Sequence, residues 1–241
     1  MDVPQNTDGK EIFFHKKGKA TPVRILDEKQ IGSGMFGDTF EAQVLVGDKG
    51  RKFVIKKFKR RYNTTAAERA ENAMKNYQAA KEAGLKVFTT YRLGEDGTSI
   101  LMTNANSDDI TCLSTLPNTV GDIKIKLTDE SFESLTDGVF AEAKKAADAN
   151  IDVYSDAYFL LVGKNSSKLD FVLGDLDNVT KEASKSPATL LSSNLINARL
   201  GLHDLFQKYA GNAALYWDRL YKKYGEATAN SARNNKPSPL E

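Results

Sequence analysis

The chain has 241 residues, 40% of them hydrophobic and 27% charged, so it can bury a core and lacks the composition of a disordered protein. Its net charge of +2 gives no electrostatic basis for nucleic-acid binding, and the single cysteine, Cys112, excludes an intramolecular disulfide and favours a reducing compartment. Because no apolar run approaches the roughly 18 residues of a membrane span, and the first residues lack a signal peptide, we expect a cytoplasmic protein.

Residues 1–20 are polar and mixed, which predicts a loose N-terminal arm with one short strand at Glu11–His15. The run from Arg24 to Ile31 predicts the first strand of a sheet. After the next two strands, the basic run Lys57–Arg61 has two interpretations. It is either a solvated strand end or a contact for an acidic or phosphorylated partner.

The segment from Ile31 to Lys57 contains glycines in the order G-x-G-x-x-G, an alternating apolar run, a glycine-containing turn and a second apolar run with Lys56. This predicts a β-hairpin with a glycine-rich tip, whose N–H groups can point at phosphate oxygens. Lys56 on the neighbouring strand can reach the same phosphates. A dinucleotide-binding turn needs a helix after the glycines, and a strand-like segment follows instead. The remaining alternative is a hairpin tip without a ligand.

These residues resemble the protein-kinase-like superfamily, in which a glycine-rich loop with an aromatic tip, here Phe36, precedes a strand ending in the nucleotide lysine, here Val54–Lys56. The resemblance implies an α+β, bilobal fold with a five-stranded antiparallel N-lobe, one helix and a short, mostly helical C-lobe. It implies ATP and Mg²⁺ as cofactors. The implied domains are a flexible arm (1–20), an N-lobe (21–104), a C-lobe (105–225) and a disordered tail (226–241).

The segment Ala66–Ala83 is rich in helix-forming residues and follows the capping residues Thr64 and Thr65, so it predicts a helix that Gly84 ends. The resemblance implies that a glutamate of this helix pairs with Lys56, and we prefer Glu71 to Glu68. The alternative is a solvent-facing glutamate.

Strands are predicted at Lys86–Tyr91 and Thr98–Thr103, around a turn at Gly94–Gly97. The resemblance then places a nucleotide-binding hinge at Leu101–Asn104. The residues expected to contact the nucleotide are Gly32, Ser33, Gly34, Met35, Phe36, Gly37, Lys56, Glu71, Met102 and Asn104.

The second half of the chain alternates helices and strands. Residues 104–128 read as a linker with a short strand at Asp122–Leu127. The further predicted elements are a helix at Ser131–Ala149 closed by Asn150, strands at Tyr158–Val162 and Leu169–Leu173, and amphipathic helices at Thr189–Tyr209 and Ala213–Tyr224.

Two acidic segments flank the second pair of strands, in the order of a kinase catalytic segment. The resemblance makes Asp175 a Mg²⁺ ligand, with Leu176 and Asp177 in place of the family's phenylalanine and glycine. Asp177 adds a second oxygen ligand. Magnesium prefers such oxygen donors, and it neutralises phosphates. The alternative is a carboxylate-rich turn without a metal.

A separate aspartate must orient the acceptor hydroxyl, and Asp156 and Asp152 are the candidates. The chain has no His-Arg-Asp triplet. Five residues after the aspartate the family has a metal-binding asparagine, but here Ala157 follows Asp152 at that spacing and Leu161 follows Asp156. We prefer Asp156, because its separation from Asp175 (175 − 156 = 19 residues) is nearer to that of protein kinases. Loss of the asparagine implies a substitute ligand, such as Asp177 or Asn178, or a weak or inactive enzyme.

The short segment after Asp175 resembles minimal kinases that bacterial pathogens deliver into host cells. The expected function is that of a monomeric, ATP- and Mg²⁺-dependent protein Ser/Thr (or Tyr) kinase, an effector with a role in virulence, whose substrate includes a host protein. Delivery into the host cytosol would then need no cleavable signal. The alternatives are a small-molecule kinase, a nucleotide-binding pseudokinase that acts as an interaction module, and a binding domain of another fold.

Overall fold

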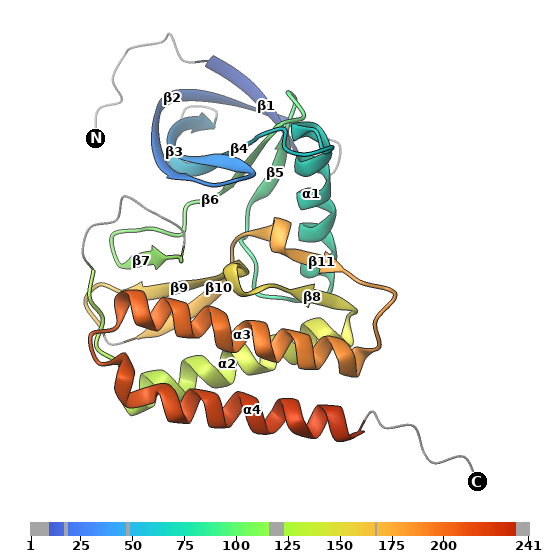
Figure 1. Ribbon diagram of the computed structural model, residues 1–241. Helices are drawn as coiled ribbons and strands as arrows, with labels where there is room; N and C mark the ends of the chain where they lie inside the picture. The colour runs from blue at the N-terminus through green and yellow to red at the C-terminus, as the bar shows by residue number, and fades with distance from the viewer. Residues whose placement is uncertain (1–9, 17–18, 47–48, 116–122, 167, 235–241) are drawn as a thin grey trace. The chain divides into compact units, whose positions relative to one another are not determined.

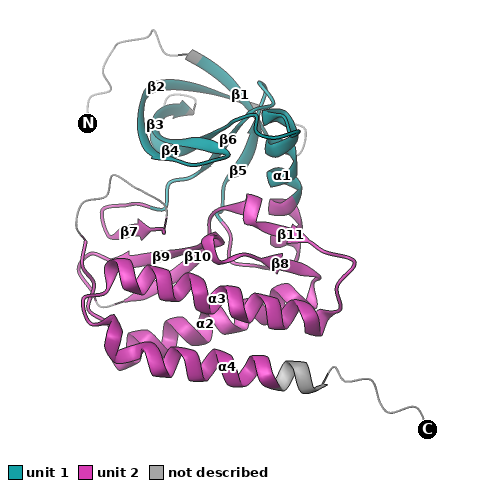
Figure 2. Cartoon of the chain, viewed as in Figure 1, with its two compact units in different colours: residues 1–75, 88–105, 116–120 teal, residues 76–87, 106–115, 121–241 magenta. Residues whose placement is uncertain are grey.

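The computed structural model describes residues 10–16, 19–46, 49–115, 123–166 and 168–234 (Figure 1). The chain divides into two compact units (Figure 2): unit 1 is residues 1–75, 88–105 and 116–120, and unit 2 is residues 76–87, 106–115 and 121–241. None of the helices in the described ranges is both long and apolar enough to cross a membrane. Both units combine helices with antiparallel strands, so the structure is of the predicted α+β class.

Unit 1 is built on a closed antiparallel barrel of six strands, in the order β1-β2-β3-β4-β6-β5. The strands are β1 (Lys10–Lys16), β2 (Lys19–Ser33), β3 (Gly37–Val46), β4 (Lys49–Phe58), β5 (Tyr91–Gly94) and β6 (Ser99–Thr103). Alternate side chains of successive strands point inward, as the period of two in a strand requires. The buried interior consists of Phe14, Val23, Ile25, Ala42, Val44, Ile55 and Leu101.

The sixth strand corrects the prediction of a five-stranded N-lobe. β1 lies within the predicted arm and includes the short strand predicted at Glu11–His15; it pairs with β2 along its whole length and with β5 at Phe14 and His15. Ile12 packs against the barrel core, and Phe14 is part of it. These two apolar positions lie on the inward face of the strand, where they contribute to closing the sheet, while Phe13 between them points to the other face.

The segment 86–90 is a second correction, because the strand predicted at Lys86–Tyr91 begins only at Tyr91. The backbone of Lys86 is engaged within unit 2: its amide donates to the Glu142 carboxylate, and its carbonyl accepts from the Leu173 amide at 2.8 Å. Since these groups already have partners, they are not available to a barrel strand.

The helix α1 (Ala66–Glu82) is confirmed. The Thr65 hydroxyl accepts a hydrogen bond from the Glu68 amide at 3.2 Å, and the Glu68 carboxylate accepts from the Thr65 amide at 2.7 Å. This reciprocal arrangement is a capping box, which satisfies amide groups that the first turn of a helix leaves without partners.

Unit 2 packs three long helices against two small sheets. The helices are α2 (Asp129–Asp148), α3 (Pro187–Tyr209) and α4 (Trp217–Asn234), with short 3₁₀ turns η1 (Ser155–Ala157), η2 (Leu176–Asn178) and η3 (Ala213–Tyr216). One sheet has the order β10-β9-β7, and the other pairs β11 with β8. The strands are β7 (Ile110–Leu113), β8 (Ile151–Val153), β9 (Tyr158–Gly163), β10 (Leu169–Leu173) and β11 (Val179–Lys181).

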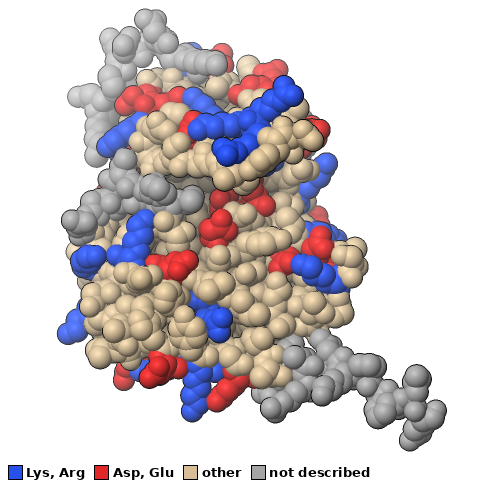
Figure 3. Space-filling model, viewed as in Figure 1, with Lys and Arg blue, Asp and Glu red and all other residues tan. Residues whose placement is uncertain are grey.

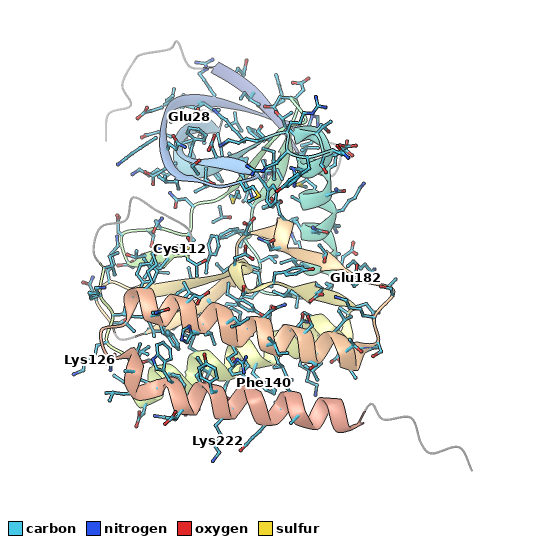
Figure 4. The ribbon with its side chains drawn as sticks, viewed as in Figure 1. Glu28, Cys112, Lys126, Phe140, Glu182 and Lys222 are labelled. Atoms are coloured by element: carbon cyan, nitrogen blue, oxygen red, sulfur yellow. The ribbon has the colours of Figure 1, made fainter. Side chains whose placement is uncertain are left out.

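Aromatic contacts join α2 to its neighbours. The Phe140 ring (labelled in Figure 4) lies 5.8 Å from that of Tyr224 in α4, and the Phe132 ring lies 6.1 Å from that of Phe206 in α3. Burial of such rings dominates core energetics.

The ends of these helices follow local chemistry. Asn150 adopts φ +56°, the left-handed conformation that ends many helices, as the sequence indicates. Pro187 opens α3 after the capping residue Ser186.

α4 continues to Asn234, so residues 226–234 of the predicted disordered tail are helical. Alanine is frequent in this stretch, and its helix propensity is the highest of all residues. The strand predicted at residues 122–127 is reduced to a single β-bridge between Ile125 and Ala210. Residue 122 of that prediction lies outside the described residues.

Charged side chains of both signs are interspersed on the visible face of each unit (Figure 3). Part of the basic run Lys57–Arg61 is paired within unit 1: the Lys57 ammonium lies 2.5 Å from Glu28, and the Lys59 ammonium lies 2.6 Å from Asp38. Two of the five positions in this run therefore serve the barrel itself.

Candidate functional site

Strand pairing in unit 1 positions Lys56 beside the glycine-rich loop. Ile55 fills the barrel core, so Lys56 projects from the opposite face of β4, where its ammonium lies 5.0 Å from the Phe58 ring centroid. In the register of β3 and β4, Lys56 is opposite Thr39, two residues after Gly37. The hairpin predicted from the sequence therefore exists and places a cation at the base of the loop.

The tip of the loop has open backbone groups. The Gly34 amide donates to the Gly37 carbonyl at 2.9 Å, so it is used inside the turn. The amides of Met35 and Phe36 have no acceptor within the part of the chain that the structure describes. Two successive amides of this kind form a site for an anion such as a phosphate.

Packing within the protein requires glycine at one of two positions in the turn, Gly37, but not at the other, Gly34. A Cβ at Gly37 would lie 2.7 Å from the Lys57 carbonyl oxygen, so packing between β3 and β4 requires glycine there. A Cβ at Gly34 would have its nearest neighbour at 3.7 Å, so packing within the protein leaves that position open. Glycine at this position would also allow the backbone to approach a ligand closely.

Asp38 fixes the base of the loop. Its carboxylate accepts from the Ser33 hydroxyl at 2.7 Å and from the Lys59 ammonium at 2.6 Å. The hydrogen bond from Lys59, followed by that from Ser33, lowers the pKa of Asp38 below its usual value of 3.8. The loop therefore emerges from a rigid, charge-paired base at neutral pH.

The other expected nucleotide contacts in unit 1 are Glu71, Met102 and Asn104. Met102 is buried in β6 opposite Val54, and the Asn104 amide donates to the Glu41 carboxylate at 2.8 Å. Glu71 lies on the exposed side of α1, whereas Ala70 on the same helix is buried. The pairing of Glu71 with Lys56 stays a prediction.

In unit 2, backbone hydrogen bonds bring the two acidic turns together. The Tyr154 amide donates to the Asn178 carbonyl at 2.9 Å, and the Gly174 amide donates to the Ala157 carbonyl at 2.9 Å. These bonds join η1, which carries Asp156, to the segment 174–178, which carries Asp175 and Asp177. Residues that are 19 positions apart in the sequence thus belong to one local arrangement.

Side chains and backbone around Asp175 are held in place. The Asn178 amide donates to the Asp175 carboxylate at 3.3 Å, and the Asn178 backbone amide donates to the Asp175 carbonyl at 3.0 Å. Leu176 is fully buried, and its carbonyl accepts from the Asn76 side chain at 2.9 Å. Leucine therefore fills the apolar role that the resemblance gives to phenylalanine.

The donors of this turn fit a magnesium ion that is bound together with a nucleotide. Asp175, Asp177 and the amide oxygen of Asn178 are all hard oxygen donors, and Mg²⁺ typically takes one or two carboxylates and completes its shell with water and phosphate oxygens. Within the described ranges, no three or more side chains of His, Cys, Asp or Glu form a metal-binding group. A metal at this turn would therefore depend on the nucleotide for part of its shell.

Asp152 lies in β8 and is 1% exposed. Its carboxylate accepts from the Lys185 ammonium at 2.5 Å and from the Ser193 hydroxyl at 3.1 Å. The hydrogen bond that Lys185 donates to Asp152 raises the pKa of Lys185 above its usual value of 10.5. Both carboxylate oxygens thus have partners in unit 2, and almost no surface of Asp152 remains for a substrate.

Asp152→Asn is expected to lower the free energy of unfolding by about 2–3 kcal/mol, since a hydrogen bond to a charged group contributes about 1.5–3 kcal/mol. Asparagine keeps the shape of the side chain, so the variant removes the charge and one of the two acceptor oxygens without changing the volume. Urea denaturation of Asp152→Asn, with the exposed Asp148→Asn as matched control, measures the effect. Equal stability of wild type and Asp152→Asn would contradict a structural role.

The same pair predicts a pH dependence. Because the pKa of Lys185 is raised in the folded state, its stabilising contribution is fully present below about 10.5 and is lost as the pH rises through the raised value. The stability difference between wild type and Asp152→Asn should therefore be constant from pH 8 to about 10 and shrink above about 10.5. A difference that persists undiminished to pH 12 would exclude the ion pair as its cause.

Asp156 lies half-buried in η1, next to the buried Ala157, which has no side-chain oxygen to offer a metal. Gly201 of α3 supports this turn. A Cβ at Gly201 would overlap the Ser155 carbonyl oxygen, so only glycine lets α3 approach η1 so closely. Nothing in the local sequence around Gly201 indicates this role.

Gly201→Ala is expected to lower the free energy of unfolding by about 1–3 kcal/mol, the usual cost of overpacking a close contact. Gly225→Ala in α4 is the matched control, since a Cβ there would have no neighbour within 4 Å. That variant should gain about 0.5–1 kcal/mol, because alanine is the better helix former. Thermal denaturation compares the two. An equal gain in both variants would show that η1 does not need the glycine.

Other reactive side chains are unsuited to nucleophilic catalysis. Burial raises the pKa of the Cys112 thiol (Figure 4) to about 12, so it is protonated at neutral pH. The His203 ring lies 4.5 Å from the Trp217 ring and 3.3 Å from the exposed Asp204 carboxylate, in a packing arrangement on α3 and α4.

Sequence reasoning missed Lys185, Asn194 and Gly201. The Asn194 side chain accepts from the Val153 amide at 2.8 Å and donates to the Ile151 carbonyl at 2.9 Å, which holds β8 in place before η1. A buried asparagine within the apolar stripe of a helix was the available signal, because a polar group at such a position needs hydrogen-bond partners.

Similarity to known proteins is found among solved structures. No protein-family model matches the chain, and no curated protein matches it. Among solved structures, the chain is similar to a ROP18 kinase domain determined in complex with AMP-PNP and sucrose, with a TM-score of 0.46 and 13% sequence identity. The alignment covers 94% of this chain and 86% of that one. The functional case therefore depends on the residues described above.

Proposed function

We propose that the chain is an ATP- and Mg²⁺-dependent phosphotransferase that acts on a hydroxyl group of a protein substrate. In this proposal the glycine-rich loop and Lys56 bind the phosphates of ATP. Asp175, with Asp177, holds Mg²⁺, and Asp156 orients the acceptor hydroxyl. The substrate class follows from the minimal-kinase resemblance, which makes a host protein the first candidate.

The observation that carries the proposal is the joining of two acidic turns in unit 2 by the Tyr154–Asn178 and Gly174–Ala157 hydrogen bonds. Phosphoryl transfer needs one carboxylate for the metal and another for the attacking hydroxyl, close together but with separate roles. Unit 1 supports the same chemistry with the open amides of Met35 and Phe36 and with Lys56 on the adjoining strand.

Each group has a defined task. Lys56 offers a positive charge to the phosphates, and the loop amides bind their oxygens. Mg²⁺, when bound, neutralises charge on the transferring phosphoryl group. Asp156 accepts a hydrogen bond from the acceptor hydroxyl and takes its proton as the new oxygen–phosphorus bond forms, while the bond between the γ-phosphorus and the bridging oxygen of ATP breaks and ADP leaves. We assign this task to Asp156 rather than Asp152, because the Asp152 carboxylate is already bound to Lys185 and Ser193.

A nucleotide-binding protein without transferase activity is the second candidate. Leu161 stands five residues after Asp156, where the family has a metal-binding asparagine, and Glu71 is exposed rather than buried. Both features would weaken catalysis more than nucleotide binding, because each concerns the alignment of metal and phosphates.

The test is transfer of labelled γ-phosphate from Mg-ATP, with the protein alone and with lysates of eukaryotic and bacterial cells. Wild type should label a protein band, and Lys56→Ala should reduce labelling to the level without enzyme. Lys52→Ala is the matched control: Lys52 is an exposed lysine of the same strand and should leave labelling unchanged.

Three outcomes separate the candidates. Labelling that depends on Lys56 supports the kinase, and the lysate that provides the band indicates the substrate source. A rise in melting temperature with ATP but no labelling supports the nucleotide-binding protein. Neither labelling nor an ATP-dependent shift in melting temperature contradicts both.

A further inference from the structure

Arg69 of α1 contacts the tip of the glycine-rich loop. Its guanidinium carbon lies 4.2 Å from the centroid of the Phe36 ring, and its Nη2 donates to the Arg61 carbonyl at 3.2 Å. Its Nε is buried and has no acceptor among the described residues. The guanidinium group is thus held by a backbone carbonyl and an aromatic face together, a geometry that suits its planar shape.

The carbonyl that holds Arg69 belongs to a tight turn. The Arg61 amide donates to the Thr64 carbonyl at 3.1 Å, and the Thr64 amide donates to the Arg61 carbonyl at 3.2 Å. Within this turn Tyr62 has φ +55°, a left-handed conformation that is uncommon for a large side chain. Such strained residues persist where the surrounding structure fixes them, so Arg69 is anchored on a rigid support.

A backbone contact joins the loop to the same support. The Lys59 amide donates to the Phe36 carbonyl at 2.9 Å, and the Tyr62 hydroxyl lies 3.9 Å from the Met35 sulfur. The tip is therefore connected to the segment 59–69 through its backbone and through two side chains. The loop is not an isolated hairpin end.

We propose that Arg69 is a positioning residue that fixes the tip of the glycine-rich loop through the Phe36 ring, so that the amides of Met35 and Phe36 are pre-organised for the phosphates of a nucleotide. The nucleotide clause rests on the proposed function, whereas the anchoring of the loop does not. Pre-organisation raises affinity because less conformational freedom is lost on binding.

The experiment measures loop anchoring and nucleotide binding separately. Amide hydrogen exchange at Lys59, followed by NMR without nucleotide, reports the Lys59–Phe36 hydrogen bond. Mg-ATP affinity is measured by calorimetry. Arg69→Ala and Phe36→Leu remove the contact, and Arg69→Lys and Phe36→Tyr retain part of it. Arg60→Ala, which removes an exposed arginine of the same connection, is the matched control.

We expect faster exchange at Lys59 in Arg69→Ala and Phe36→Leu, and wild-type exchange in Arg60→Ala. Affinity for Mg-ATP should fall about three- to thirty-fold in the same two variants, the range that a cation–π contact covers. Phe36→Tyr and Arg69→Lys should recover most of both effects. The KM for ATP should rise, with kcat changed less than about twofold.

Unchanged exchange in Arg69→Ala would overturn the proposal. Altered exchange with unchanged ATP affinity would overturn its nucleotide clause and leave the proposed function intact. If wild type binds no nucleotide while exchange responds as expected, the proposed function and the nucleotide clause both fail, and the anchoring of the loop stands.

Discussion

We expect Asp175→Ala to lower the rate of phosphoryl transfer by about 10³-fold or more and to remove the Mg²⁺-dependent part of ATP binding, while the protein stays folded. The expected size follows from the several kcal/mol that a metal ion contributes to transition-state stabilisation in such reactions. Asp175 precedes η2, and its carboxylate accepts a hydrogen bond from the Asn178 side chain at 3.3 Å, so thermal denaturation of the variant must accompany the rate measurement. Single-turnover transfer and calorimetric titration of ATP with and without Mg²⁺ measure the two effects.

Two further variants serve as a control and as a weaker form of the same change. Asp148→Ala removes an exposed carboxylate at the end of α2 and should leave transfer unchanged. Asn178→Ala removes the amide that holds the Asp175 carboxylate, so it should weaken transfer less than Asp175→Ala does. Transfer at the wild-type rate in Asp175→Ala would reject the assignment of the metal to this turn.

We expect Asp156→Asn to lower transfer by about 10²–10⁴-fold, the usual contribution of a positioned general base, and to leave the affinity for Mg-ATP within about twofold of wild type. Asparagine retains the size of the side chain but cannot take the proton. Asp152→Asn provides the comparison: it should affect the free energy of unfolding first, and transfer only as far as the folded fraction falls. Single-turnover rates below the unfolding transition distinguish the two variants.

The opposite result would make Asp152 the catalytic residue and Asp156 the structural one. If Asp152→Asn abolished transfer in a protein of wild-type stability, and Asp156→Asn remained active, the Lys185–Asp152 pair would have to open during the reaction. In that case Lys185→Met would change the rate of transfer as well as the free energy of unfolding.

Elements with strong local patterns could be predicted from the sequence. The strand Leu169–Leu173 has the predicted bounds, and α1 ends one residue before its predicted end. In both cases the hydrophobic period and the flanking turn residues act within one short segment. The hairpin that places Lys56 beside the glycine-rich loop was predictable for the same reason.

Elements that depend on distant partners could not be predicted in this way. β1 has only two inward apolar residues, and its full length as a strand depends on its pairing with β2 and β5. Lys86 has strand-like neighbours, but the Glu142 carboxylate and Leu173 occupy its backbone groups. In each case a contact with a residue far away in the sequence decides the outcome.

The same limit applies to the candidate site. The spacing of Asp152 and Asp156 leaves both available as the catalytic residue, and the ion pair with Lys185 that distinguishes them joins residues 33 positions apart. For Glu71, the phase of α1 matters: Ala70 and Ala73 face the interior, and Glu71 lies on the outer side of the same turn.

Closure of the barrel by β1 affects how the protein can be shortened. A protein that begins at residue 21, the N-lobe boundary suggested by the polar composition of the first residues, would lack β1 and the buried Phe14 ring. The backbone groups of β2 and β5 that pair with β1 would then form two unpaired sheet edges beside a hydrophobic opening. Exposed edges of this kind add strands from other molecules, so such a truncation would favour aggregation over a stable smaller domain.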